Sequence, residues 1–390
     1  MAEQRSRPIR VLRVMGRANV GGPALQAVVL QRGLVPPEFE TMLVVGRMAH
    51  GEEDYLQLRA PDVDHVMMGW GGRLPAFSDA FAFIRLLLLT RRFKPDIMHT
   101  HTAKAGVLGR IVAIVCRVPI RVHTFHGHLL RGYFRPWLTK AIVTMERVLA
   151  SRTTCLVAVG EKVRDELLAA GIGTPDQFQV VPPGVPLEQL LVLEPGETAV
   201  RDELRIDHGA PVVGFLGRLV AIKRIDRLVD IIREIATADP DVEFIVVGDG
   251  PERSRLEELR SQLGRRLHLL GWRGDVAAVL GAMDVVVNTS ENEGMPVALI
   301  EAGAAGKPVV ATDVGSTAEV VSPTVSGFVL PYELEAFVGH TLRLLSDSEL
   351  RAKMGARGRE LSVAQFGEAR LAGDMAHTYR RLVNDRGRTR

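Results

Sequence analysis

Short, continuous apolar runs alternate along the chain with longer stretches of helical periodicity, and this alternation is the feature that most limits the possible folds. The runs are rich in β-branched residues, which is typical of parallel strands buried on both faces. Six such strands are expected in the first half, at 9–14, 41–45, 97–99, 121–124, 154–159 and 179–181. Strand and helix in alternation predict right-handed βαβ units, so the expected fold class is α/β with doubly wound parallel sheets.

The same alternation starts again after Pro182-Pro183-Gly184-Val185-Pro186, a segment whose prolines favour a linker. Six further strands are expected at 211–216, 243–247, 267–270, 285–288, 308–311 and 327–330. A chain of 390 residues is also too long for one ordinary core. We therefore expect two Rossmann-like domains, residues 1–185 and 186–365, that face each other across a cleft at the carboxyl ends of their strands. A helical tail begins at Ser348, and its last part, about 366–390, is expected to pack back on the first domain.

Composition and charge restrict the class of protein further. The two cysteines, Cys116 and Cys155, lie in apolar runs and are expected to be reduced core residues. Residues 1–13 lack the apolar stretch of a signal peptide, and no run reaches the ~18–20 apolar residues of a membrane span, so a cytoplasmic protein is expected.

The two halves of the chain differ in charge. Residues 1–185 contain 24 Lys and Arg against 15 Asp and Glu, whereas residues 186–390 contain 25 Lys and Arg against 31 Asp and Glu. The basic half indicates either an ordinary solvated surface or an anionic partner, and without a nucleic-acid-binding motif that partner is expected to be anionic lipid or a lipid-linked phosphate.

Two cations follow the first strand of the second half. Gly217 and Arg218 end this strand, and Lys223 comes five residues after Arg218. Glycine lets a ligand approach the backbone, and a guanidinium with an ammonium suits a diphosphate. The structural alternative is a loop with two exposed basic residues. The turn Gly248-Asp249-Gly250-Pro251 after the next strand occurs in many Rossmann-like domains and is a weaker signal.

The strongest signal is the segment from Glu293 to Glu301, which follows the strand expected at 285–288. Gly294-Met295-Pro296 marks a tight turn and a helix start, where free N–H groups and the helix dipole favour a phosphate. Glu301 stands in an otherwise apolar helix, so its charge needs a polar partner. We expect the two carboxylates to accept hydrogen bonds from sugar and ribose hydroxyls, and a solvated helix face is the alternative.

These motifs, in this order and spacing over about residues 210–330, resemble the signature of glycosyltransferase family 4, as does Gly306-Lys307-Pro308-Val309-Val310-Ala311-Thr312. The resemblance implies a GT-B fold, a nucleoside-diphosphate-sugar donor, retention of anomeric configuration, and no obligatory metal or other cofactor. It assigns Arg218 and Lys223 to the donor diphosphate, Glu293 to the donor sugar and Glu301 to the ribose. The further donor contacts that it implies are Gly217, Gly271 beside the base, and Gly294, Met295 and Pro296.

The first half carries a matching set of residues. Gly21-Gly22-Pro23 opens a helix after the first strand and resembles the family's glycine loop, in which Gly21 and Gly22 would close over the donor phosphates. The family often has His on that helix, where this chain has Gln26. His101 and Lys104 follow another strand and are candidate acceptor contacts, with a capped loop as the alternative. Among the histidines at 123, 126 and 128, the resemblance favours His126 as a donor-sugar contact, whereas metal binding and a satisfied core histidine are the alternatives.

Breaking an anomeric bond releases a charged diphosphate, so fixed positive groups are the main catalytic requirement. Arg218, Lys223 and helix N-terminal amides can supply them without Mg²⁺, and with His126 and Glu293 they form the predicted catalytic set. No carboxylate is marked as a covalent nucleophile, so attack on the same face is favoured over a covalent intermediate. Three other classes stay open: a GT-B nucleotide-sugar 2-epimerase, a non-catalytic nucleotide-sugar-binding protein, and a nicotinamide oxidoreductase, although residues 16–22 lack the G-x-G-x-x-G spacing.

The acceptor is indicated only by surface chemistry. Residues 129–138 mix arginine with aromatic residues and leucine, as interfacial segments do, although a packed helix and loop would have a similar composition. We expect a lipid-diphosphate-linked sugar in surface-polysaccharide or glycolipid synthesis, with a soluble glycan as the second choice. Peripheral contact with the inner face of an anionic membrane would accompany the first. Uridine diphosphate sugars are the first expected donors, followed by guanosine diphosphate mannose.

Overall fold

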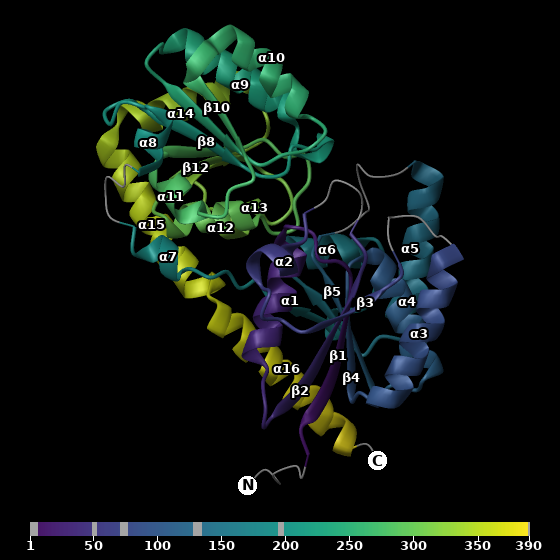
Figure 1. The fold of residues 1–390 in the computed structure, drawn as a ribbon. Coiled ribbons are helices and arrows are strands. Elements are labelled where there is room, and N and C mark those ends of the chain that lie inside the picture. The colour runs from purple at the N-terminus through teal and green to yellow at the C-terminus, as the bar shows by residue number, and fades with distance from the viewer. Residues whose placement is uncertain (1–6, 49–52, 71–76, 128–134, 194–198, 389–390) are drawn as a thin grey trace. The chain divides into compact units, whose positions relative to one another are not determined.

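The structure, a computed structural model, describes residues 7–48, 53–70, 77–127, 135–193 and 199–388 (Figure 1). The chain divides into two compact units: unit 1 is Met1–Val185 with Glu368–Arg390, and unit 2 is Pro186–Gly367. Each unit is built on one sheet in which every described strand pair is parallel. The expected α/β class with two Rossmann-like sheets is therefore confirmed.

The sheet of unit 1 has seven strands in the order β3-β2-β1-β4-β5-β6-β7. These are β1 (Ile9–Arg17), β2 (Phe39–Gly46), β3 (His65–Met68), β4 (Ile97–His101), β5 (Ile120–Phe125), β6 (Cys155–Ala158) and β7 (Phe178–Val180). Its helices are α1 (Gly22–Gly33), α2 (Tyr55–Arg59), α3 (Phe77–Phe93), α4 (Ala103–Val115), α5 (Pro136–Ala150), α6 (Glu161–Ala169) and α16 (Glu368–Arg388). The order of strands reverses between β1 and β4, and ligands of doubly wound sheets bind at such a switch point, beyond the carboxyl ends of the strands.

The sheet of unit 2 has six strands in the order β10-β9-β8-β11-β12-β13, so its switch point lies between β8 and β11. These are β8 (Val212–Leu216), β9 (Glu243–Val247), β10 (Leu267–Gly271), β11 (Val285–Asn288), β12 (Val309–Thr312) and β13 (Gly327–Leu330). Its helices are α7 (Glu188–Leu191), α8 (Ala199–Leu204), α9 (Ile225–Ala238), α10 (Arg253–Leu263), α11 (Val276–Gly281), α12 (Val297–Ala304), α13 (Thr317–Val320), α14 (Leu334–Ser346) and α15 (Ser348–Phe366).

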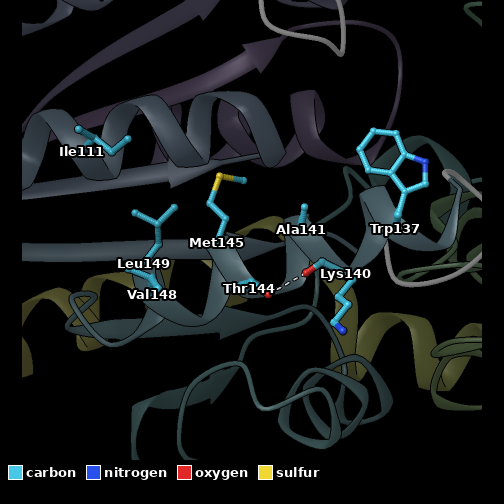
Figure 2. Close-up of a pocket in the computed structure, with 8 residues that line it drawn as sticks. All are labelled: Ile111, Trp137, Lys140, Ala141, Thr144, Met145, Val148 and Leu149. Atoms are coloured by element: carbon cyan, nitrogen blue, oxygen red, sulfur yellow. Dashed lines mark hydrogen bonds between the residues drawn. The ribbon is translucent and has the colours of Figure 1, made fainter.

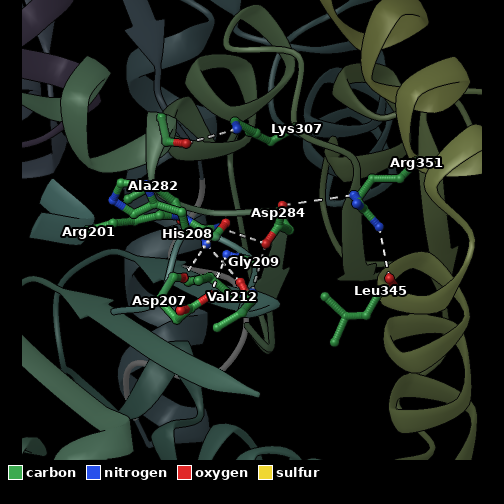
Figure 3. Close-up of polar contacts among 12 residues, drawn as sticks. Arg201, Asp207, His208, Gly209, Val212, Ala282, Asp284, Lys307, Leu345 and Arg351 are labelled. Atoms are coloured by element: carbon green, nitrogen blue, oxygen red, sulfur yellow. Dashed lines mark hydrogen bonds and ion pairs between the residues drawn. The ribbon is translucent and has the colours of Figure 1, made fainter. Parts of the chain in front are cut away.

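A polar cluster fixes the edge of the unit 2 sheet at which the strands begin (Figure 3). The opposite edge, formed by the carboxyl ends of the strands, is the ligand edge. Asp284 precedes β11, and its Oδ2 accepts hydrogen bonds from the guanidinium of Arg201 at 2.9 Å and from the N–H of Val212 at 2.8 Å. Lys307 precedes β12 and donates to the carbonyl of Gly281 at 3.1 Å, while burial lowers the pKa of its ammonium to about 8. These contacts satisfy buried polar groups around the starts of three strands, and so they help to fix the sheet that carries the ligand edge.

Close helix packing holds α12, the helix that carries Glu301. Its outer side lies against α15, where a Cβ on Gly303 would come within 2.6 Å of the hydroxyl of Ser362 and 3.2 Å of the carbonyl of Gly358. The hydroxyl of Ser362 also donates to the carbonyl of Ile300 at 3.2 Å. The glycines therefore allow a backbone approach that any larger residue would prevent.

The fold contains two elements that the sequence did not predict. The edge strand β3 and the short helix α2 are not among the expected elements, because β3 is only four residues long and mostly not buried. The helical tail predicted from Ser348 consists of two helices, because Gly367 is extended, with φ −69° and ψ 149°, and separates α15 from α16. Of these, α15 belongs to unit 2, and α16 packs against α1 of unit 1. None of the described helices is both long enough and apolar enough to cross a membrane.

Candidate active site

The two loops at the switch point of unit 2 are hydrogen-bonded to each other. After β8, the 3-10 turn Ala221–Lys223 presents the side chain of Lys223. After β11, the hydroxyl of Thr289 donates to the carbonyl of Lys223 at 2.8 Å, and the N–H of Glu291 donates to the carbonyl of Ile222 at 2.9 Å. The Lys223 loop and the loop that leads to Glu293 thus form one supported surface at the ligand edge of the sheet.

The side chain of Glu293 receives three hydrogen bonds on a single oxygen. Its Oε1 accepts from the ammonium of Lys223 at 2.5 Å, the hydroxyl of Ser290 at 2.7 Å and the amide of Asn288 at 3.3 Å. Among the residues that the structure describes, none donates a hydrogen bond to Oε2, which leaves that oxygen to accept from a ligand. Burial alone would raise the pKa of this carboxyl, but the charge of Lys223 and the three hydrogen bonds outweigh it and lower the pKa below its ordinary value.

Arg218 differs from Lys223 in this cluster. It is half-buried, and its guanidinium has no hydrogen-bond or ion-pair partner among the residues that the structure describes. A Cβ added at the preceding residue, Gly217, would lie 3.8 Å from Cε of Lys223, so the two cations flank the same turn. The positive charge of Lys223 is balanced by Glu293, whereas that of Arg218 is available to an anion.

The glycine turn after β9 has a structural explanation. A Cβ on Gly248, which has φ +127°, would lie 1.9 Å from the carbonyl oxygen of Gly217, and one on Gly250, with φ +153°, would lie 2.3 Å from that of Leu219. The N–H of Leu219 donates to the carbonyl of Asp249 at 2.9 Å. The turn therefore supports the loop that carries Arg218 from behind.

The start of α12 completes the cluster in unit 2. Gly294, Met295 and Pro296 lead into this helix, whose first N–H groups have no acceptor within the helix. Gly315 has φ +50°, and a Cβ there would lie 1.8 Å from the carbonyl oxygen of Glu293, so a second loop packs directly on the turn. Glu301 is half-buried in the second turn of α12. Gly271 ends β10 with φ +65°, and its carbonyl accepts from the N–H of Gly248 at 2.7 Å.

A cluster of histidines, of which His99, His101 and His123 are buried, marks the switch point of unit 1. His101 ends β4 and is 1% exposed, and His126 follows β5. Nδ1 of His101 lies 2.9 Å from Nε2 of His126, and the two rings stack with centroids 5.2 Å apart. Burial lowers the pKa of His126 to about 4, and burial together with neighbouring cations and histidines lowers that of His101 well below its ordinary value. Both imidazoles are therefore neutral at pH 7, and one of the two nitrogens must donate to the other.

The rest of the cluster supports these two rings. His99 contacts the hydroxyl of Tyr379 on α16 at 2.5 Å and that of Thr124 at 2.7 Å, and His123 contacts the hydroxyl of Thr100 at 2.8 Å. Within the described ranges, no group of three His, Cys, Asp or Glu side chains could hold a metal ion. The histidines instead contact one another and the hydroxyl groups of neighbouring elements, whereas Nε2 of His101 is buried without a hydrogen-bond partner among the described residues.

The loop between His101 and Lys104 is held in an unusual conformation. Thr102 has φ +65° and ψ 160°, a region that is almost restricted to glycine. Its hydroxyl accepts from the N–H of Gly16 at the end of β1, at 3.0 Å, and so bridges the two strands of the switch point. Lys104, predicted as an acceptor contact, forms an ion pair with Asp79 on α3 at 2.8 Å. Gly21 caps α1, and Gly22 begins it, so the glycine loop lies at the same sheet edge.

Comparison with known proteins identifies the family. Residues 197–361 match the family described as "Glycosyl transferases group 1", and residues 21–184 match the "Glycosyl transferase 4-like domain". The UDP-Gal:alpha-D-GlcNAc-diphosphoundecaprenol alpha-1,3-galactosyltransferase of Escherichia coli is 30% identical over 280 residues, which cover 70% of this chain and 72% of that protein. The chain is a group 1 glycosyltransferase. The capsular polysaccharide biosynthesis glycosyltransferase CapM of Staphylococcus aureus is 23% identical over 79% of this chain and 83% of its own.

Solved structures give the fold of this glycosyltransferase. Anabaena HepE, crystallised with UDP and glucose, superposes with a TM-score of 0.79 at 21% identity, over 95% of this chain and 99% of that one. Sucrose-phosphate synthase from Thermosynechococcus elongatus also gives a TM-score of 0.79, over 96% of this chain and 99% of its own. The expected GT-B fold is therefore confirmed.

The sequence interpretation missed three polar residues of this glycosyltransferase. Asn288 and Ser290 donate to Glu293, and Thr102 bridges β1 and β4. Asn288 was detectable in principle, because a single amide ends an otherwise apolar strand at the ligand edge. The other two carry no signal of their own, since their roles depend on contacts between segments that the sequence does not show.

Proposed function

We propose that this glycosyltransferase moves a sugar from a nucleoside-diphosphate donor, first of all a uridine diphosphate sugar, to a hydroxyl of a lipid-diphosphate-linked sugar. Transfer retains the anomeric configuration and requires no metal ion. The observation that carries the proposal is the cluster at the switch point of unit 2, where Arg218 has no partner among the described residues and lies beside the Lys223–Glu293 pair. The name of the Escherichia coli relative contains UDP-Gal and diphosphoundecaprenol, which supports this choice of donor and acceptor. HepE was crystallised with UDP, which also supports the donor.

The chemistry of the donor divides between these side chains. Arg218 binds and neutralises the diphosphate as the glycosidic C–O bond breaks, assisted by the N–H groups at the start of α12. Lys223 holds Glu293 ionised and adds charge at the same turn, and Oε2 of Glu293 accepts a hydrogen bond from a hydroxyl of the sugar. Glu301 accepts from the ribose hydroxyls. Removing one such preorganised donor to the leaving group costs about 3 kcal/mol, or roughly a hundredfold in rate.

Retention follows from attack on the face that the leaving group occupies. The acceptor hydroxyl forms the new C–O bond, the diphosphate leaves with the electron pair of the old bond, and a phosphate oxygen takes the proton of the hydroxyl. His126 is neutral, and its imidazole hydrogen-bonds a hydroxyl of the donor sugar. Because His101 is buried against His126, it contributes to the transfer reaction by orienting the imidazole ring of His126.

A thermal-shift panel of nucleoside diphosphates and their sugars tests the donor. A ligand at 100 times its Kd stabilises the folded protein by about 2.7 kcal/mol, so the true donor raises the Tm by several degrees. The same panel with the Arg218→Ala variant should show little shift, while the Lys353→Ala variant, altered at an exposed site on α15, should behave like the wild type. If no nucleoside diphosphate shifts the melt of the wild type, the proposed donor class is wrong.

A transfer assay tests the reaction. The enzyme, a uridine diphosphate sugar, EDTA and a lipid-diphosphate sugar should yield a product whose new linkage has the anomeric configuration of the donor. A product of opposite configuration, or a strict requirement for Mg²⁺, would overturn that part of the proposal. Incubation without acceptor is the control for an epimerase, which would convert the donor to a new nucleotide sugar.

A further inference from the structure

Exposed apolar side chains gather on three neighbouring helices of unit 1. Nine of the twelve large apolar side chains that are exposed in the described part of this unit lie on α3, α4 and α5, which adjoin one another along one flank of the sheet (Figure 1). On α3, Phe81, Ile84 and Leu88 recur at helical spacing and are 66%, 54% and 58% exposed. Ile114 and Val115 continue this surface on α4. Exposed apolar side chains that gather in this way on neighbouring helices mark an interaction site.

A groove between α4 and α5 extends the same surface (Figure 2). It has a volume of about 760 Å³, and Ile111 of α4 and Met145 of α5 face it from opposite sides. Trp137, at the first turn of α5, is 68% exposed, and Val148, three turns later, is 63% exposed. Lys140 lines the groove between them, so a cation lies among apolar side chains along the length of the helix.

The charges around this surface have one sign. Residues 77–152 contain 13 Lys and Arg but only 3 Asp and Glu, so this stretch accounts for the whole positive excess of residues 1–185. All three acids are buried in ion pairs, Asp79 with Lys104, Asp96 with Arg7 and Glu146 with Arg110. The exposed charges on the three helices are therefore all positive, and they are Arg85, Arg91, Arg92, Lys140 and Arg147.

The position of this surface relates it to the acceptor. A helix that follows a parallel strand starts at the carboxyl edge of the sheet and runs back along it. The amino-terminal turns of α4 and α5, with Trp137, therefore lie at the sheet edge that carries His101 and His126. A lipid-linked acceptor held in a bilayer against these helices would present its sugar at that edge.

We infer that the α3–α4–α5 face binds the surface of an anionic lipid bilayer. Apolar and aromatic side chains interleaved with cations are the composition by which helices lie in a membrane interface. A second copy of this chain is a poor occupant, because two such faces would bring like charges together. The inference builds on the proposed lipid-linked acceptor, since it supplies the surface that brings the enzyme to that substrate.

Co-sedimentation of the full-length protein with vesicles tests the inference. Binding to vesicles rich in phosphatidylglycerol, absent with phosphatidylcholine alone, is expected and should weaken at high salt. Each cation near an anionic surface contributes about fivefold to partitioning, so the triple variant R85Q/R91Q/K140Q should bind about 100-fold more weakly. The matched control R260Q/R265Q/K353Q, which removes three exposed cations from unit 2, should change partitioning by less than about twofold.

The apolar part has its own variant, F81S/W137S, which should lower binding at every salt concentration because it removes two exposed rings that would insert into the interface. Equal binding of the two triple variants would overturn the inference. So would a wild-type dimer in sedimentation velocity that F81S/W137S dissociates, because the face would then be covered by a second copy. Donor-induced thermal shifts on the same samples separate the two proposals. Shifts without vesicle binding overturn only the membrane surface, and vesicle binding without shifts overturns only the proposed donor.

Discussion

The ammonium of Lys223 and Oε1 of Glu293 lie 2.5 Å apart, and this pair joins the loop after β8 to the loop after β11. The side chain of Lys223 is 17% exposed and that of Glu293 10%, so both charges are largely removed from water. Breaking one partner of such a pair leaves an uncompensated charge in a poorly solvated site. Lys223 therefore affects both the charge on Glu293 and the geometry of the loop that carries it.

The Lys223→Met variant should lose activity most strongly at low pH. Glu293 accepts hydrogen bonds only when it is ionised, and Lys223 opposes the effect of burial, which raises the pKa of this carboxyl. Without Lys223 the pKa of Glu293 rises, so the acid limb of the profile of kcat/KM against pH moves to higher pH. Lys353→Met is the matched control and should leave the profile in place. An unchanged acid limb in Lys223→Met would show that Lys223 does not set the ionisation of Glu293.

Ser290→Ala should lower kcat about tenfold with little change in the affinity for a nucleoside diphosphate. The hydroxyl of Ser290 is buried and donates to Glu293 at 2.7 Å, and a hydrogen bond to a charged group contributes about 1.5–3 kcal/mol. Glu293→Gln, which removes the charge itself, should cost about a hundredfold. A calorimetric titration with the nucleoside diphosphate checks affinity, and transfer assays check kcat. If Ser290→Ala weakens nucleotide binding as much as it lowers kcat, its role is not the positioning of Glu293.

Much of the donor cluster could be predicted because its chemistry is local in sequence. The segment from Glu293 to Glu301 combines a turn, a helix start and two carboxylates. Each of these features can be recognised from residues that are adjacent in the chain. The histidine cluster is different, since Tyr379 contacts His99 from 280 positions away, and periodicity carries no trace of that contact. The convergence of Asn288, Ser290 and Lys223 on one oxygen likewise depends on how two loops pack.

The fold was predictable for the same reason, and its misses follow the same rule. Buried strands produce continuous apolar runs. In contrast, β3 is a short edge strand whose residues are mostly not buried, so it gives no such signal. The break of the tail at Gly367 depends on contacts that periodicity does not show, because α15 packs against α12 in unit 2 and α16 packs against α1 in unit 1. At the break itself, the single residue Gly367 is extended and separates the two helices.

Thr102→Gly should be more stable than Thr102→Ala, which reverses the usual order of the two residues. Both variants lose the hydrogen bond to Gly16, but only glycine adopts φ +65° and ψ 160° without strain. The difference in the free energy of unfolding should be about 1–3 kcal/mol in favour of glycine. Urea denaturation followed by circular dichroism measures it. Equal stability of the two variants would mean that the backbone around residue 102 relaxes when the side chain is shortened.

Acidification should destabilise unit 1 between pH 6.5 and 4. Burial lowers the pKa of His126 to about 4 and that of His99 well below its ordinary value, whereas in the unfolded chain both titrate near 6.5. The unfolded state therefore binds more protons in this window, so the stability is fully present above about pH 6.5 and is lost as the pH falls toward 4. His126 alone contributes at most about 3 kcal/mol. Thermal melts at a series of pH values should show a shallower fall for His126→Asn than for the wild type.

His101 is expected to act through His126 rather than on a substrate. Its ring is 1% exposed and its Nδ1 contacts Nε2 of His126, so it fixes the orientation of that imidazole and determines which nitrogen carries the proton. His101→Ala should lower kcat about tenfold while leaving the Kd of the nucleoside diphosphate unchanged. His101→Asn, whose amide nitrogen occupies nearly the place of Nδ1, should recover most of that loss. If both variants reduce only the Tm and kcat stays at the wild-type value, the contact between the two histidines is structural and His126 needs no orienting partner.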